Sequence, residues 1–278
     1  METIEGLVTT LRGKEPGPHI VISGSVHGNE TCGPDAFEEI LPTLSLARGS
    51  ATFVISNPKA RERRVRFTEA NLNRLFKSDE FISPEQKSTY EYKRSRELMP
   101  LFLEADALLD IHSGATPGME PFAICNPLSG AVARTLGFPI VSWGWDVLEP
   151  GGTDDYMYLN GKIGVCVECG YHTDSESIEY AKRAIYNFLG SMGLIDFTPE
   201  RMSSRYIKTT HVHVAQVDFR PARSFKDFDF VKKEELIGID GKTSVFAPYD
   251  CLVLFVRSRD EAGHEAFLVA KEVSEMEF

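Results

Sequence analysis

Short apolar runs, each followed by polar residues, are the feature that most limits how this chain can fold. The runs rich in β-branched residues, bounded by Gly or Pro, are typical of buried strands. In open α/β sheets, ligand sites lie beyond the carboxyl ends of the strands. The sequence therefore predicts that these polar groups gather along one edge of a sheet. The runs at 19–24, 51–56 and 105–109 precede the polar segments 27–30, 71–74 and 110–112, and a fourth run, 163–167, leads into Glu168.

Strand-like and helix-like patterns alternate up to about Ser191, which predicts a mixed central sheet flanked by helices. We expect helices over 33–46, over 83–98 with Ser83 as N-cap, and over 177–192.

The pattern changes after residue 199. Residues 209–219 alternate in polarity, Asp240-Gly241 is a hairpin signal, and 251–256 is a compact apolar run. We therefore expect an α/β catalytic domain over 1–199 and a small β-rich C-terminal domain over 200–278.

The charge balance and the cysteines narrow the function classes. A net charge of -11 disfavours nucleic acid and anionic membranes as partners, and no apolar run is long enough to span a bilayer. The five cysteines form no disulfide framework, so we expect reduced thiols in a cytoplasmic protein. The composition indicates an enzyme acting on a small molecule. Homo-oligomer formation is possible.

The pair His27-x-x-Glu30 offers an imidazole and a carboxylate on a Gly-flanked turn, and it could be an ordinary polar turn. His112 supplies a further ligand type at the end of a second strand, and Asp110 can orient that histidine. Two histidines and one carboxylate with an open position are the pattern of catalytic zinc. We therefore expect one Zn²⁺ per chain at His27, Glu30 and His112.

Glu168 lies within an apolar strand, where a carboxylate is costly unless it is paired or exposed at a cleft. Beside a metal-activated water, it would be a suitable general base and later a general acid. The alternative is an edge-strand glutamate that faces water. Cys166 and Cys169 read better as two core thiols than as a redox or zinc motif.

Arg66 and Arg74 bracket Asn71 and Asn73 in the segment after the second strand. Their guanidinium and amide groups suit recognition of a carboxylate and of a developing oxyanion. The alternative is a salt-bridged structural loop.

Taken together, these motifs resemble the succinylglutamate desuccinylase/aspartoacylase family, relatives of the zinc carboxypeptidases. The resemblance rests on residues 24–30, 57–60 with Arg66, 71–74, 110–112 and 167–170. It implies a zinc-carboxypeptidase-like α/β fold and hydrolysis of the linear amide bond of an N-acyl amino acid that carries a free carboxylate.

The resemblance also implies roles for single residues. His27, Glu30 and His112 would hold zinc, and Glu168 would activate its water. Arg66 would stabilise the oxyanion, and Asn73 with Arg74 would bind a substrate carboxylate. The C-terminal β-rich segment would border the active-site entrance.

Two departures concern the substrate. Aspartoacylases carry an arginine about ten residues before the catalytic glutamate, where residues 154–159 have two acids and no arginine. The C-terminal segment 255–267 also lacks the tyrosine that aspartoacylases contribute. A dianionic acyl-aspartate is thus disfavoured, and the acyl amino acid stays open.

Three further readings remain open at this point. A carboxypeptidase-like metallopeptidase could act on a short peptide with a cationic group facing Asp154 and Asp155. A metal-stabilised binding protein would keep the fold without catalysis. His211-x-His213 could form a second metal site, although an ordinary pair of partly exposed histidines is the simpler interpretation.

Overall fold

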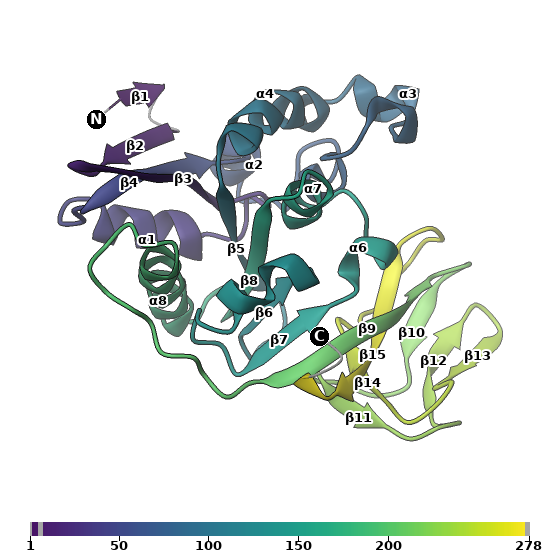
Figure 1. Cartoon of the computed structure of the whole chain (residues 1–278). Helices are drawn as coiled ribbons and strands as arrows, with labels where there is room; N and C mark the ends of the chain where they lie inside the picture. Colours follow the sequence, from purple (N-terminus) through teal and green to yellow (C-terminus); the bar gives the residue numbers. More distant parts are fainter. Residues whose placement is uncertain (1, 5–7, 276–278) are drawn as a thin grey trace.

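The computed structural model describes residues 2–4 and 8–275, which form a mixed sheet with helices packed against both faces (Figure 1). Within these residues, twelve strands make one sheet in the order β1-β2-β4-β3-β5-β8-β6-β7-β9-β15-β14-β11, and β10-β12-β13 make a second sheet. The central strands β4, β3, β5 and β8 run parallel, and β6 is antiparallel to β8. The α/β fold class expected from the sequence is therefore confirmed.

The strands are β1 (Glu2–Ile4), β2 (Val8–Arg12), β3 (Glu15–Gly24), β4 (Arg48–Ile55), β5 (Ala107–Gly114), β6 (Phe122–Cys125), β7 (Ile140–Trp143), β8 (Ile163–Tyr171), β9 (Arg205–Val214), β10 (Phe219–Pro221), β11 (Asp229–Val231), β12 (Leu236–Asp240), β13 (Thr243–Phe246), β14 (Cys251–Leu254) and β15 (Glu265–Val273). The α-helices are α1 (Cys32–Ile40), α2 (Pro58–Arg63), α3 (Pro84–Lys87), α4 (Tyr90–Glu104), α5 (Gly130–Ala133), α6 (Trp145–Leu148), α7 (Thr153–Leu159) and α8 (Glu176–Ser191). Short 3₁₀ turns are η1 (Leu72–Arg74), η2 (Asp79–Phe81) and η3 (Pro127–Ser129).

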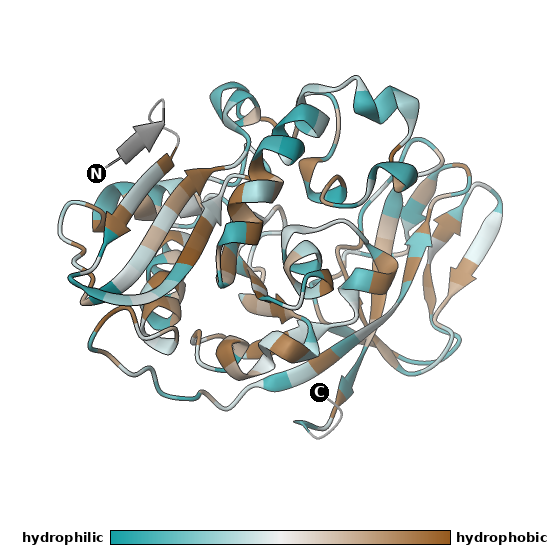
Figure 2. Ribbon diagram, turned by 45° about the horizontal axis from the view of Figure 1, so that its top comes forward, coloured by the Kyte–Doolittle hydropathy of each residue, from teal (hydrophilic) through white to brown (hydrophobic). Residues whose placement is uncertain are grey.

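The central strands are mostly apolar, and helices cover both faces of the sheet that they form. Successive side chains of a strand point to opposite faces, so Ile22 packs in the cluster that contains α1 and α8, while Val21 packs with α4 and α7. Figure 2 shows the same arrangement, with hydrophobic colour along the strands and hydrophilic colour on the outer faces of the helices. This packing fixes the strand ends from which the polar segments emerge.

Two of the expected helices differ from the structure in their bounds. The helix expected over 33–46 ends at Ile40, because Pro42 has no N–H with which to continue the backbone ladder. The stretch 83–98 forms two helices, α3 and α4. Ser83 caps α3 as expected, in a capping box with Gln86, and Thr89 then caps α4 by accepting a hydrogen bond from the Tyr92 N–H. The helix expected over 177–192 is confirmed as α8.

All elements from Arg205 to Val273 are strands, and β12 and β13 form the hairpin expected at Asp240-Gly241. Strand β9 pairs in parallel with β7, so the main sheet continues into the C-terminal segment. The division into domains at residues 199 and 200 stays a prediction. In the described part of the chain, no helix is long and apolar enough to cross a membrane.

Candidate metal centre and active site

His27 and Glu30 lie in the loop that connects β3 to α1. Ser25 takes a positive φ of 55° directly after the strand, which turns the chain across the sheet edge. Gly28 packs against the backbone of α2, where an added Cβ would lie 2.0 Å from the carbonyl carbon of Ala60. Only glycine fits at this position, and the close packing holds the loop over the end of β5, which carries His112.

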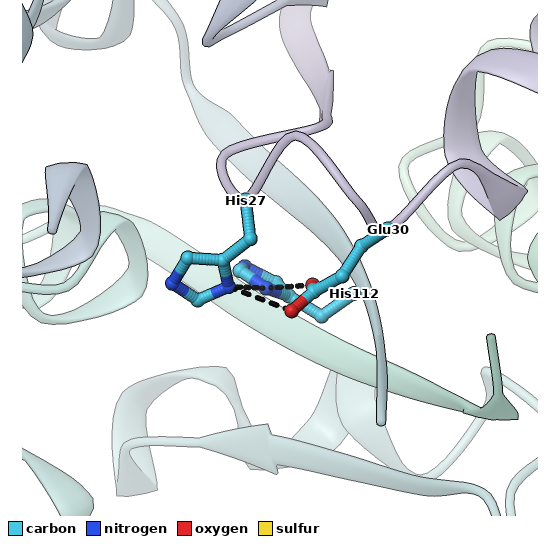
Figure 3. Close-up of side chains that lie close together, drawn as sticks. All are labelled: His27, Glu30 and His112. Atoms are coloured by element: carbon cyan, nitrogen blue, oxygen red, sulfur yellow. Dashed lines mark hydrogen bonds and ion pairs between the residues drawn. The ribbon is translucent and has the colours of Figure 1, made fainter. Parts of the chain in front are cut away.

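The three side chains expected to bind metal converge in the protein interior (Figure 3). The Glu30 carboxylate lies 2.8 Å from Nδ1 of His27 through one oxygen and 2.8 Å from Nδ1 of His112 through the other. The two Nδ1 atoms are 3.2 Å apart, and all three residues are almost fully buried. Two imidazole nitrogens and one carboxylate at this spacing are a ligand set suited to a divalent metal ion.

Polar residues behind the site fix the orientation of both histidines. Nε2 of His112 lies 3.0 Å from the carboxylate of Asp110, which also accepts a 2.6 Å hydrogen bond from the Thr153 hydroxyl. Nε2 of His27 lies 3.0 Å from the side-chain oxygen of Asn71. Asp110 therefore stands where the sequence predicted it, whereas the contacts of Asn71 and Thr153 were missed. Each outer contact leaves Nδ1 turned toward the centre.

The same contacts set the protonation of the cluster. Burial lowers the pKa of His27 to about 4. Burial opposes ionisation of Glu30, but His27 and His112 outweigh it and hold the Glu30 pKa well below its usual range. Burial would also lower the pKa of His112, yet the surrounding acidic groups, Asp110 and Glu30 among them, raise it well above 6.5. In the metal-free chain, His112 thus carries the proton that a bound ion would replace.

Glu168 lies opposite His112, because the two are register partners in the parallel strands β5 and β8. Strand β8 is an interior strand of the sheet, so the alternative of an edge-strand glutamate facing water is wrong. One carboxylate oxygen of Glu168 is buried and has no hydrogen-bond partner among the described residues. Burial, followed by the Glu30 charge, raises its pKa to about 8. Such a buried carboxylate needs a nearby cation or a water molecule as its partner.

The two arginines lie on the same cavity but have different partners. Nη1 of Arg66 donates to Glu30 at 3.1 Å, so this guanidinium borders the metal cluster directly. Arg74 forms an ion pair with Glu149 and donates to the Asn73 carbonyl oxygen at 2.7 Å. The Asn73 side-chain oxygen accepts a hydrogen bond from the Thr153 N–H at 3.3 Å.

A cavity of about 230 Å³ unites these groups. Its lining includes the three proposed metal ligands together with Arg66, Asn73, Arg74, Asp154, Asp155 and Glu168. Asp155 accepts a hydrogen bond from the Gly151 N–H at 3.1 Å, and burial raises the pKa of Asp154 to about 7. Trp145, Phe255 and Arg257 also line the cavity and were missed, because no local motif marks them. The C-terminal segment thus borders the site.

His211 and His213 do not form a metal site with other residues of the described chain. Nε2 of His213 lies 3.1 Å from Asp240, and its ring stacks on Phe267 at 4.9 Å between centroids, while His211 is exposed. Over residues 2–4 and 8–275, the cluster of His27, Glu30 and His112 is the only one suited to a metal. All five cysteines are buried and free, so Cys166 and Cys169 belong to the core.

A mixed α/β fold with a buried His-Glu-His group and an unpartnered carboxylate in one cavity defines the chain as a candidate metal-dependent hydrolase. The chain belongs to the succinylglutamate desuccinylase/aspartoacylase family, because the model of that family's catalytic domain matches residues 16–191.

Individual relatives agree with this assignment. A succinylglutamate desuccinylase of Idiomarina loihiensis is 24% identical, and the match covers 91% of this chain and 82% of the relative. An N-acyl-aromatic-L-amino acid amidohydrolase of Xenopus laevis is 33% identical over 107 residues, about a third of each chain. The crystal structure of a succinylglutamate desuccinylase from Vibrio parahaemolyticus superposes with a TM-score of 0.78 at 19% identity, over 96% of this chain and 86% of the other.

Proposed function

We propose that this chain is a zinc-dependent amidohydrolase that cleaves the amide bond of an N-acyl amino acid with a free α-carboxylate. One observation carries the proposal: the buried His27-Glu30-His112 cluster and the unpartnered carboxylate of Glu168 meet in a single cavity. Family membership supports the reaction class, since the relatives named above are deacylases of N-acyl amino acids by name.

His27, Glu30 and His112 would hold the ion through two Nδ1 atoms and a carboxylate oxygen. The bound ion supplies Lewis acidity, which polarises the scissile carbonyl and makes a water molecule more acidic. Asp110 and Asn71 keep the imidazoles aimed at the centre by holding the opposite ring nitrogens.

Glu168 takes the proton of the attacking water and then delivers it to the departing amine nitrogen. Its buried, unpartnered oxygen gives it the free lone pairs that this transfer needs. Its pKa of about 8 belongs to the metal-free chain, and a nearby dication would lower it so that the base is ionised at neutral pH.

Arg66 bonds to Glu30 in the metal-free chain, so its guanidinium lies beside the point where the tetrahedral oxyanion would develop. Arg74 and Asn73 line the cavity from η1 and would bind the substrate carboxylate. Because Arg74 is paired with Glu149, a substrate carboxylate has to take the place of Glu149.

A carboxypeptidase-like metallopeptidase is the second candidate, because Asp154 and Asp155 line the cavity and could accept a cationic group of a short peptide. The hydrogen bond from Gly151 gives Asp155 a structural role as well, which favours the amidohydrolase.

A substrate panel on the zinc-loaded protein separates the two candidates. N-acetyl amino acids are compared with dipeptides that have the same C-terminal residue and a free amino group. We expect kcat/KM to be at least about tenfold higher for the acetyl series, because a free ammonium would stand beside the metal and Arg66. Faster cleavage of the dipeptides would assign the chain to the peptidases.

A further inference from the structure

An aromatic wall forms one side of the cavity, beside the proposed general base. Trp145 and Phe255 are partly exposed and line the cavity together with Ile124 and Val256. Their rings lie 5.9 Å apart between centroids, and both pack against the buried Phe122. Phe122 is the register partner of Glu168 in the antiparallel strands β6 and β8. The wall therefore starts one strand away from the base.

The rigidity of the wall comes from the core behind it. Phe122, Ile124 and Phe228 belong to one buried cluster, and Trp145 and Phe255 are its partly exposed margin. Phe122 and Phe228 meet edge to face at 5.1 Å. The cluster joins β6 to the C-terminal strand β14, so the wall exists only because the C-terminal strands pack beside the catalytic residues.

Backbone conformations also hold both exposed rings in place. Phe255 has a positive φ of 55°, a costly conformation for an aromatic residue, and its N–H donates to Asp227 at 2.6 Å. Trp145 follows Gly144, where an added Cβ would lie 2.6 Å from the Thr209 carbonyl oxygen. The indole N–H of Trp145 donates to Ser142 at 2.8 Å. With that polar atom satisfied, the exposed part of the indole offers a ligand apolar surface only.

The charged residues next to the wall disfavour an anionic group there. Asp146 and Glu149 come from the same segment as Trp145 and line the cavity, and the Glu149 charge is paired with Arg74. Arg257, on the C-terminal side, donates through Nη2 to Glu265 at 3.2 Å, so its charge is compensated, although its buried Nε has no hydrogen-bond partner among the described residues. An apolar group gains free energy by covering the rings, whereas a second carboxylate would meet the charge of Asp146.

We propose that Trp145 and Phe255 form the subsite for an apolar, preferably aromatic, group of the substrate. The inference rests on the proposed function and names the substrate class of that site: N-acyl amino acids with a bulky apolar group on the side chain or on the acyl chain. The apolar group could belong to the amino-acid side chain or to the acyl chain, and the two substrate series below distinguish these cases.

Two matched series test the subsite in the zinc-loaded protein. The first varies the side chain at constant acyl group, in N-acetyl derivatives of L-alanine, L-leucine, L-phenylalanine and L-aspartate. The second varies the acyl group on L-alanine, from acetyl to phenylacetyl. We expect kcat/KM to rise about 10- to 200-fold from the smallest to the aromatic member of one series, the scale on which apolar pockets discriminate.

Variants connect that preference to the wall. Trp145→Ala and Phe255→Ala should remove most of the aromatic preference and leave the rate for N-acetyl-L-alanine within a few-fold, while Trp145→Phe should retain part of it. Phe246→Ala is the control, because Phe246 is exposed on β13 and lies outside the cavity lining. An equal loss of kcat/KM for all substrates would overturn the inference. A preference for N-acetyl-L-aspartate would also overturn it and would indicate that Arg257 binds the substrate side chain instead.

A binding measurement keeps the subsite testable if turnover fails. Binding of N-acetyl-L-phenylalanine to the zinc-loaded Glu168→Gln protein, followed by calorimetry, should weaken about tenfold or more in Trp145→Ala. If Glu168→Gln binds N-acetyl-L-phenylalanine but the unmodified zinc-loaded protein does not hydrolyse it, the result counts against the proposed function alone. Binding that is absent, or that Trp145→Ala leaves unchanged, would overturn the subsite.

Discussion

His112 and Glu168 face each other across the paired strands β5 and β8, in a register that places a proposed metal ligand beside the proposed base. Parallel pairing brings the carboxyl ends of these strands to one edge, so residues 56 positions apart in sequence share a site. The proposed proton transfer by Glu168 to and from groups at the metal depends on this adjacency.

Glu168→Gln tests the role of the base. The amide keeps the shape of the side chain but cannot accept a proton, so kcat should fall by about two to four orders of magnitude. Zinc content should stay near that of the unmodified protein. Near-normal turnover in zinc-loaded Glu168→Gln would make this residue structural.

Arg66→Ala tests stabilisation of the oxyanion. Loss of one such donor lowers kcat by about two to three orders of magnitude, and KM should change little. Arg63→Ala is a suitable control, because Arg63 is an exposed residue of α2 outside the cavity lining. A change confined to KM would show that Arg66 binds substrate instead.

Arg74 should act on substrate binding, and Glu149 should oppose it. Arg74→Ala is expected to raise KM by tenfold or more with kcat much less affected. Glu149→Gln removes the competing carboxylate of the Arg74 ion pair, so KM should fall in that variant. A higher KM in Glu149→Gln would indicate that Glu149 positions Arg74 for the substrate.

Asp110→Asn probes the support behind the metal ligand. The Asp110 carboxylate lies 3.0 Å from Nε2 of His112, and loss of such an outer contact weakens metal affinity about 10- to 100-fold. Competition with a chelator of known affinity measures the change. An unchanged dissociation constant would mean that the Asp110 carboxylate is not needed to orient His112.

The raised pKa of His112 predicts that metal binding is linked to proton release. In the metal-free chain His112 is protonated near neutral pH, and the ion has to displace that proton. Affinity should therefore rise with pH, and calorimetry in buffers of different ionisation enthalpy should detect at least about one proton released per ion. Proton uptake on binding would refute the assignment of the proton to His112.

The sequence was sufficient to predict the α/β fold class and a set of polar residues that share one cavity, because strand periodicity and polar strand ends are local signals. The apolar runs before Glu30 and His112 indicated the carboxyl ends of two strands, and these residues lie in the loop after β3 and near the end of β5. Contacts such as that of Asn71 with His27 and that of Thr153 with Asp110 depend on tertiary packing and have no local signature. The aromatic wall at Trp145 and Phe255 was missed for the same reason.

In two segments, capping and strand pairing set element limits that differ from those expected from the sequence pattern. Ser83 was identified as a cap, but a second cap at Thr89 divides the expected helix. Segment 209–219 alternates in polarity, yet β9 begins at Arg205 and ends at Val214, because pairing with β7 and β15 sets its limits.

Titration of the metal-free protein with Zn²⁺, with hydrolysis of an accepted N-acyl amino acid as the readout, tests the central claim most directly. Activity should be absent after chelation, rise in proportion to added zinc and level off at one equivalent per chain, and His112→Ala should neither bind the ion stoichiometrically nor recover activity. Full activity in the chelated protein, or a stoichiometric recovery in His112→Ala, would contradict the metal centre formed by His27, Glu30 and His112.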